Sequence, residues 1–219
     1  MKAAVRERFG PPEVVELREL ETPVPADDEV LVRIHASSIN MSDWYGVRGR
    51  PVVGRVAMGL RGPKELRLGT DYAGRVEAVG KDVTQFRPGD EVFGGRTGAW
   101  ADYVVAKADR GIVPKPANVS FEDAAAVPVA AITALQAIRD KGELQHGQRV
   151  LIHGASGGVG TFAVLVAKAL GGEVTAVCGP RGIEIARSLG ADHVVDYTQE
   201  DFARDGARYD LLVDVKGGR

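Results

Sequence analysis

The first 110 residues alternate short apolar runs with turn residues, and no long stretch shows the period of a helix. In the segment EVLVRIHA, Val30, Val32 and Ile34 fall on one face while Arg33 and His35 fall on the other, which is typical of a half-buried strand. The segments DYAGRVEAVG, GDEVFG and AWADYVVAK repeat this pattern, each bounded by Gly, Pro or Asp. The pattern predicts an all-β, barrel-like N-terminal domain.

The pattern becomes helical after residue 120. Ser120 followed three residues later by Asp123 is a capping-box pattern, and an alanine-rich run comes next. Pro128 is expected to end this first short helix, because its ring blocks the hydrogen bond and the space that a continuing turn needs. A second helix then runs to about Arg139, and Gly142 closes it.

Strands and helices alternate from about residue 148 onward. Apolar runs predict strands over 149–153, 174–178, 193–196 and 209–215, with helices over 159–170 and 181–189. Strands separated by helices indicate a parallel sheet with right-handed crossovers. The expected fold class is therefore α/β, with a β-barrel domain over 1–120 and a nucleotide-binding type of domain over 121–219.

A glycine cluster separates the strand at 149–153 from the helix that follows it. This strand-to-helix context is the one that a dinucleotide fingerprint requires. Small residues bring the backbone close to a pyrophosphate, and the free N–H groups and positive dipole end of the helix point toward it. Packing alone also produces such turns, but the alternation of strands and helices favours cofactor binding. The predicted contacts are Ala155, which replaces the first glycine of the fingerprint and follows Gly154, and Ser156, Gly157, Gly158, Val159 and Gly160.

The end of the second strand indicates which dinucleotide is bound. An NAD site places an acidic residue there to accept hydrogen bonds from the ribose 2′-hydroxyl group. Here Cys178 stands in that position, and Arg181 follows shortly after it. The absence of a carboxylate and the presence of a guanidinium suit a 2′-phosphate, so NADPH is the predicted cofactor. The alternative is that Arg181 is only a solvated residue of the next helix.

The composition of the chain indicates which kind of molecule it binds. The 219 residues carry a formal net charge of -2 and a pI near 6.1, which gives no basic field for nucleic acid or for an anionic membrane. The apolar stretch 124–138 is too short to span a bilayer. The start MKAAVRERFG lacks the apolar core of a secretion signal, and Cys178 is the only cysteine. These features predict a cytoplasmic protein that acts on a small molecule.

The order of several motifs resembles a known family. ASSINMSDW, LGTDYAGRVEAVG, GDEVFG, GAWADYVV, AVPVAAITALQAI, VLIHGASGGVG and LGADHVVDY follow one another along the chain. This order is similar to that of the medium-chain dehydrogenase/reductase superfamily, in particular its zinc-independent quinone oxidoreductase branch. The resemblance implies a GroES-like barrel domain, a Rossmann domain, and NADPH in the cleft between them.

The resemblance also bears on zinc. Zinc-dependent relatives carry a cysteine where this chain has Asn40, and a His-Glu pair where it has Thr70 and Asp71. The cysteine-rich lobe of those enzymes is missing as well. A catalytic zinc needs three Cys, His or carboxylate ligands. The chain has four histidines, His35, His146, His153 and His193. Their spacing does not fit metal binding, so no metal site is expected.

Without a metal, hydrogen bonds must stabilise the oxygen on which negative charge develops. The resemblance implies that Asn40 and Tyr45 lie near the nicotinamide and donate such bonds. It places Tyr197 against the adenosine phosphate end, although packing at a strand end would explain that tyrosine equally well. Asp43 and Trp44 are more simply read as a helix cap and a packing residue.

The predicted parallel sheet is incomplete. A Rossmann sheet has six strands, and the sequence provides four of them, ending in an apolar edge strand over 209–215. The chain is thus expected to be a C-terminally truncated member of the family, without the strands that would form the usual homodimer edge. The favoured function is NADPH-dependent reduction of a quinone or of an α,β-unsaturated carbonyl. An inactive remnant that binds only the adenosine and pyrophosphate end of NADPH is the alternative, and a zinc-dependent alcohol dehydrogenase is disfavoured.

Overall fold

The computed structural model describes residues 1–60, 62–202 and 208–216. It divides into two compact units, Met1–Val129 and Ala130–Arg219. The short helix after Ser120 belongs to the first unit, whereas the sequence pattern assigns it to the second domain.

The first unit is built on antiparallel strands. Its main sheet has the order β6-β3-β4-β5-β7, and β1 and β2 form a separate two-stranded ribbon. The predicted alternation holds from Val32 onward, because Val32 is fully buried and Ile34 partly buried in β3, while Arg33 and His35 are exposed. The strands are β1 (Lys2–Val5), β2 (Glu16–Glu19), β3 (Glu29–Ser37), β4 (Asp71–Val79), β5 (Glu91–Gly95), β6 (Tyr103–Lys107) and β7 (Val113–Pro114).

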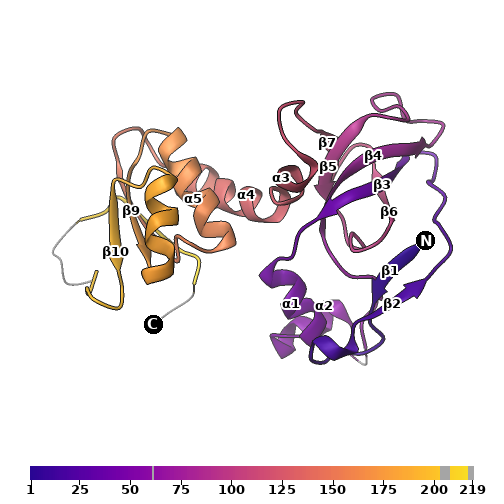
Figure 1. Ribbon diagram of the computed structural model, residues 1–219, viewed down its shortest axis with the longest axis horizontal. Helices are drawn as coiled ribbons and strands as arrows, with labels where there is room; N and C mark the ends of the chain where they lie inside the picture. Colours follow the sequence, from indigo (N-terminus) through magenta and orange to yellow (C-terminus); the bar gives the residue numbers. More distant parts are fainter. Residues whose placement is uncertain (61, 203–207, 217–219) are drawn as a thin grey trace. The chain divides into compact units, whose positions relative to one another are not determined.

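The expectation that this part is all-β is wrong, because it also contains helices. Two helices lie at the end of the unit beside β1 and β2 (Figure 1), and a third, α3, packs on the main sheet. The backbone N–H of Asn40 donates to the Asp43 carboxylate over 2.8 Å, so the interpretation of Asp43 as a helix cap is confirmed. An eight-residue helix is too short to show a clear period. The elements are α1 (Met41–Arg48), α2 (Arg55–Met58), α3 (Phe121–Ala125) and the 3-10 turns η1 (Pro12–Val14) and η2 (Val52–Gly54).

The predicted break at Pro128 is confirmed. The hydroxyl of Ser120 accepts a hydrogen bond from the Asp123 backbone N–H at the start of α3, which ends at Ala125. Helix α4 (Pro128–Leu135) begins at the proline and continues as the π-helical turn η3 (Gln136–Lys141). Over the described ranges, no helix is long and apolar enough to cross a membrane.

The second unit contains a four-stranded parallel sheet with the order β10-β9-β8-β11. Numbered from the first strand of the unit, this is the order 3-2-1-4 of a Rossmann sheet, so the predicted partial Rossmann domain is confirmed. Helix α5 packs against β8 and β9, as Figure 1 shows. The elements are β8 (Arg149–His153), α5 (Gly158–Ala169), β9 (Glu173–Cys178), η4 (Pro180–Gly182), α6 (Ile183–Ser188), β10 (His193–Asp196) and β11 (Leu211–Asp214).

Glycines allow the close approach of β8 and α5. Gly154 ends the strand with a φ of 85°, a left-handed conformation that favours glycine. Ala155 follows it and is fully buried in the core. A Cβ atom on Gly160 would overlap the carbonyl oxygen of Gly154, so only glycine fits at that point of the helix.

We expect Gly160→Ala to lower the free energy of unfolding by about 2 kcal/mol, because the added methyl group forces strand and helix apart. Gly158→Ala is the matched control, since a Cβ atom there meets nothing within 4 Å. It should be neutral or slightly stabilising. Urea unfolding followed by circular dichroism measures both, and equal effects of the two variants would contradict this packing argument.

Candidate functional site

The turn after β8 presents backbone N–H groups at the start of α5. Gly157 is the N-cap residue in an extended conformation, and Gly157 and Gly158 are exposed. The first N–H groups of a helix have no partner within it, and the helix dipole makes this end attractive to anions. The predicted glycine turn therefore has the geometry of a phosphate-binding helix start.

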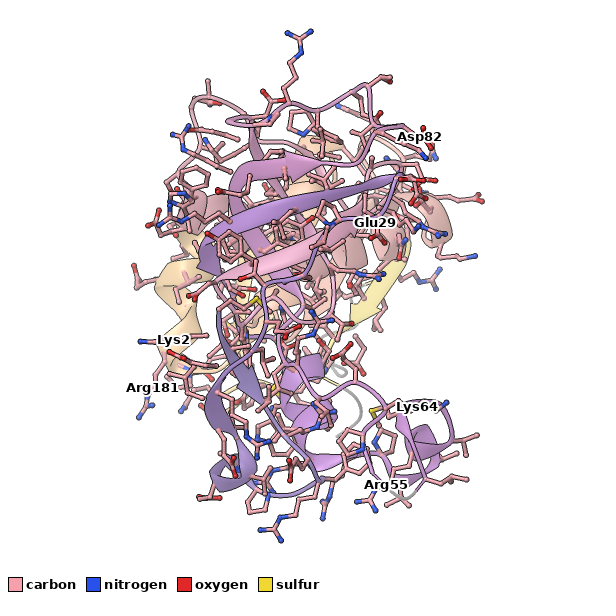
Figure 2. The ribbon with its side chains drawn as sticks, turned by 90° about the vertical axis from the view of Figure 1, so that its right-hand side faces the viewer. Lys2, Glu29, Arg55, Lys64, Asp82 and Arg181 are labelled. Carbon is pink, nitrogen blue, oxygen red and sulfur yellow. The ribbon has the colours of Figure 1, made fainter. Side chains whose placement is uncertain are left out.

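A cavity of about 340 Å³ lies beside this turn, at the carboxyl end of β9. It brings together Ser156, Arg181 and Tyr197, which the sequence analysis assigned to the cofactor from three separate segments. Arg181 is exposed (Figure 2), and none of the described residues that line this cavity is acidic. An anion therefore meets a guanidinium and two hydroxyl groups there without carboxylate repulsion.

Two glycines that the sequence analysis did not assign shape the same cavity. A Cβ atom on Gly182 would collide with the Ser156 side chain, and one on Gly179 would lie 3.0 Å from the Tyr197 hydroxyl oxygen. Their missing side chains leave room for both polar groups. The segment CGPRG, with two glycines around Pro180, carries the signal that could have identified them.

The Cys178 side chain points into the core rather than into this cavity. Its thiol is almost completely buried, and burial, followed by the charge of Asp196, raises its pKa. Asp196 stands opposite Cys178 on β10, where its carboxylate accepts hydrogen bonds from the N–H and hydroxyl groups of Thr198. Any contact of Cys178 with a cofactor would therefore involve its backbone.

Lys216 adds positive charge near Tyr197. Its ammonium nitrogen lies 4.4 Å from the centre of the tyrosine ring. Nearby, at the end of β8, the His153 ring nitrogen Nδ1 lies 3.0 Å from the Asp214 carboxylate. Within the described residues, no three His, Cys, Asp or Glu side chains are grouped closely enough to hold a metal ion.

In the first unit the predicted residue Asn40 belongs to a buried network. Its amide Nδ2 donates to the Asp71 carboxylate over 2.9 Å and to the Ser38 hydroxyl over 3.2 Å. The Ser38 hydroxyl donates to the same carboxylate over 3.1 Å, and so does the backbone N–H of Val129 over 3.2 Å. Asp71 is fully buried. Burial raises its pKa against the effect of the bonds from Asn40, Val129 and Ser38, and the charge of Asp43 raises it further.

These bonds engage both N–H groups of the Asn40 amide. An amide nitrogen has two hydrogens, so this conformation leaves none for a substrate oxygen. Tyr45, the other predicted donor, is different, because it lies on α1 with 44% of its surface exposed. Its ring packs edge-on against Trp44. Of the two predicted catalytic residues, the geometry favours Tyr45 as a donor and gives Asn40 a positioning role.

The three positions that would carry zinc ligands bond to one another and to their neighbours. Asn40 and Asp71 bond directly, and the Thr70 hydroxyl donates to the Asp43 carboxylate over 3.0 Å. Neither an amide nor a hydroxyl side chain is a usual zinc ligand. This donor set does not fit a catalytic zinc.

Comparisons with known proteins agree with the architecture. A family described as "Alcohol dehydrogenase GroES-like domain" matches residues 26–117, and one described as "Zinc-binding dehydrogenase" matches residues 158–215. The mitochondrial NAD(P)H oxidoreductase RTN4IP1 of Mus musculus is 36% identical over the whole of this chain, which spans 60% of that protein. The quinone oxidoreductase of Pseudomonas aeruginosa is also 36% identical, and the chain spans 64% of it.

Solved structures give the same result. The quinone oxidoreductase from Coxiella burnetii has a TM-score of 0.88 and 34% identity, covering 100% of this chain and 69% of its own. The Escherichia coli quinone oxidoreductase complexed with NADPH has a TM-score of 0.80 and 32% identity, covering 92% of this chain and 60% of its own.

The buried Asp71 carboxylate predicts an unusual dependence of stability on pH. Because its pKa is raised in the folded state, the folded chain holds this proton more tightly than the unfolded chain. We expect wild type to gain stability relative to Asp71→Asn as the pH falls from neutral toward the ordinary carboxyl value of 3.8. Thermal unfolding at a series of pH values measures the difference.

Asp192→Asn provides a control of opposite sign. Burial raises the pKa of Asp192, but bonds from Lys168 and the Val174 N–H and the charge of Lys168 lower it more. Wild type should therefore lose stability relative to Asp192→Asn as the pH falls through the same range. The stability difference between wild type and variant is plotted against pH for each variant. If it changes in the same direction for Asp71→Asn and Asp192→Asn, the opposite pKa shifts assigned to the two carboxyl groups are contradicted.

Proposed function

Because the chain belongs to the medium-chain dehydrogenase/reductase superfamily, in its quinone oxidoreductase-like branch, we propose that it takes part in NADPH-dependent reduction of a quinone or of an α,β-unsaturated carbonyl without zinc. The observation that carries the proposal is the cavity at the end of β9. It joins Ser156, Arg181 and Tyr197 beside a helix start, and its lining within the described part of the chain has no carboxylate.

The residues of the second unit fit the phosphate-bearing end of NADPH. The N–H groups at the start of α5 would bind the pyrophosphate. Arg181 would pair with the 2′-phosphate, which its planar guanidinium can bind through two hydrogen bonds. An NAD-specific site would need an acidic side chain at the same place, and the lining residues that the structure describes include none. NADPH, when bound, supplies the hydride.

The residues of the first unit would assist at the acceptor. The exposed Tyr45 hydroxyl would donate a hydrogen bond to the oxygen on which negative charge develops, which lowers the barrier to hydride transfer. Asn40 would hold the start of α1 in place through its bonds to Asp71 and Ser38, and α1 in turn positions Tyr45. The unsuitable donor set at Asn40, Thr70 and Asp71 supports chemistry without zinc.

The other candidate is binding of the adenosine and pyrophosphate end of NADPH without turnover. The chain spans 60–69% of the relatives described above, and the four-stranded sheet contains the adenosine half of the fold. Fluorescence titration with NADPH followed by addition of a quinone separates the two functions. Oxidation of NADPH supports the reductase, and binding without oxidation supports the binding module. A cytoplasmic location and a small-molecule acceptor complete the proposal.

Arg181→Gln is expected to weaken NADPH binding about tenfold and to leave NADH binding unchanged, because the lost guanidinium contacts only the 2′-phosphate. Arg187→Gln is the matched control, since Arg187 is exposed on α6 and pairs with Glu184. Fluorescence titration with both cofactors measures the ratio. Equal losses for NADPH and NADH in Arg181→Gln would contradict this role.

Tyr45→Phe is expected to lower kcat by about 10- to 100-fold without changing the Kd for NADPH, because it removes a hydrogen bond that strengthens in the transition state. Tyr103→Phe on β6 is the control and should leave kcat unchanged. Steady-state kinetics with a quinone, together with cofactor titration, test the pair. A rise in the Kd with unchanged kcat would argue against Tyr45 as a donor.

A further inference from the structure

A second cavity of about 290 Å³ lies within the first unit. Its wall includes side chains from the end of β1, from α1 and from the segment that leads into β4. The charged or hydroxyl-bearing residues that the argument uses are Arg6, Asp43, Lys64, Glu65, Arg67 and Thr70.

Arg6 is the unusual residue in this wall. It is only 8% exposed, and its Nε atom is buried with no hydrogen-bond partner among the described residues. Its guanidinium lies 5.5 Å from the Phe9 ring centre. Burial lowers its pKa, against the opposing charge of Glu65. A buried cation without a bonded partner is costly, because it gives up water and gains no hydrogen bond in return.

The two acidic residues of the wall already have partners. The Asp43 carboxylate accepts from the Asn40 N–H and the Thr70 hydroxyl. The Glu65 carboxylate bonds to Arg67 over 3.2 Å and 3.3 Å through two guanidinium nitrogens. Neither carboxylate is hydrogen-bonded to Arg6.

Positive charge dominates the surrounding chain. Between Asp43 and Glu65 the sequence contains no acidic residue, whereas Arg48, Arg50, Arg55, Arg61 and Lys64 are basic. Figure 2 places Arg55 and Lys64 on the same lobe of the first unit. Lys64 also lines the cavity. A ligand in this cavity therefore meets the buried Arg6 and the Lys64 side chain, together with two carboxylates that already have hydrogen-bond partners.

We propose that this cavity binds the oxyanion group of an acidic small-molecule acceptor, such as a carboxylate or sulfonate, with the Arg6 guanidinium as its main donor. The anion would supply a hydrogen-bond acceptor for the Arg6 guanidinium and would add to the opposing charge of Glu65. Thr70 lines the same cavity and joins it, through Asp43, to the network around Asn40. The inference rests on the proposed function only in naming the ligand as the acceptor, because anion binding itself needs no turnover.

Calorimetric titration of the full chain with 1,4-naphthoquinone-2-sulfonate and with uncharged 1,4-naphthoquinone, at constant ionic strength in chloride, tests the proposal. Wild type should bind the sulfonate about tenfold more tightly than the uncharged quinone. Arg6→Gln should remove this preference and leave the affinity for the uncharged quinone unchanged. Arg18→Gln is the matched control, because Arg18 lies on β2 of the same unit and pairs with Glu7 and Glu16 on the surface. It should behave as wild type.

Competition by inorganic phosphate identifies the source of the oxyanion. Displacement of the sulfonate at millimolar phosphate supports a site for any small oxyanion, and no displacement supports recognition that also needs the organic part of the ligand.

Equal affinity of wild type for the two quinones would overturn the proposal, as would equal losses in Arg6→Gln and Arg18→Gln. If Arg6→Gln does not fold, Lys64→Gln carries the test, with a loss of about threefold expected for the sulfonate alone. Failure of the proposed reductase function appears separately, as retained binding without NADPH oxidation.

Discussion

The first unit depends on one fully buried carboxylate, that of Asp71. A buried charge is tolerated only when hydrogen bonds replace its hydration. Here the bonds come from Asn40 and Ser38 at the junction of β3 and α1, and from Val129 at the start of α4. Two segments far apart in the sequence are thereby fixed to the first residue of β4. Loss of the acceptor would leave buried donors unpaired on each of them, which costs more than the removal of a whole hydrogen-bonded pair.

This arrangement changes what Asn40 can do. The resemblance to zinc-independent reductases implies that its amide donates to the acceptor, yet both amide hydrogens are used within the network. Its backbone N–H also donates, to the Asp43 carboxylate that caps α1. All three donor hydrogens of Asn40 thus hold the helix that carries Tyr45. The position at which the resemblance places a zinc ligand of other members here supports α1 instead.

The sequence predicts the second unit more completely than the first. Strands β8 and β10 have the predicted bounds. The central strand β8 is a continuous apolar run because it is buried, and the edge strand β10 is a short apolar pair between polar residues. Helix α1 is predicted only through its cap at Asp43 and not by its pattern, since eight residues give little periodicity. The sequence predicts that Arg181 and Tyr197 lie together, because their strands are neighbours in the expected strand order. It does not predict that the Cys178 side chain points inward, because that direction depends on the pleat of β9. Arg6 has no sequence signal, because a charged residue after a short strand is normally solvated.

The two anion-binding features differ in what holds the charge. At the start of α5 the donors are backbone N–H groups, which every residue except proline provides. Anion binding there depends on the conformation of the backbone and on small residues that let the anion come close to it. In the cavity of the first unit the donor is one side chain, whose buried charge has no hydrogen-bonded partner of its own among the described residues. A single substitution can remove such a site without disturbing the fold, because the site's charge destabilises the empty protein. The proposed cofactor site would therefore be the more constrained of the two, and the proposed class of acceptor the more easily changed.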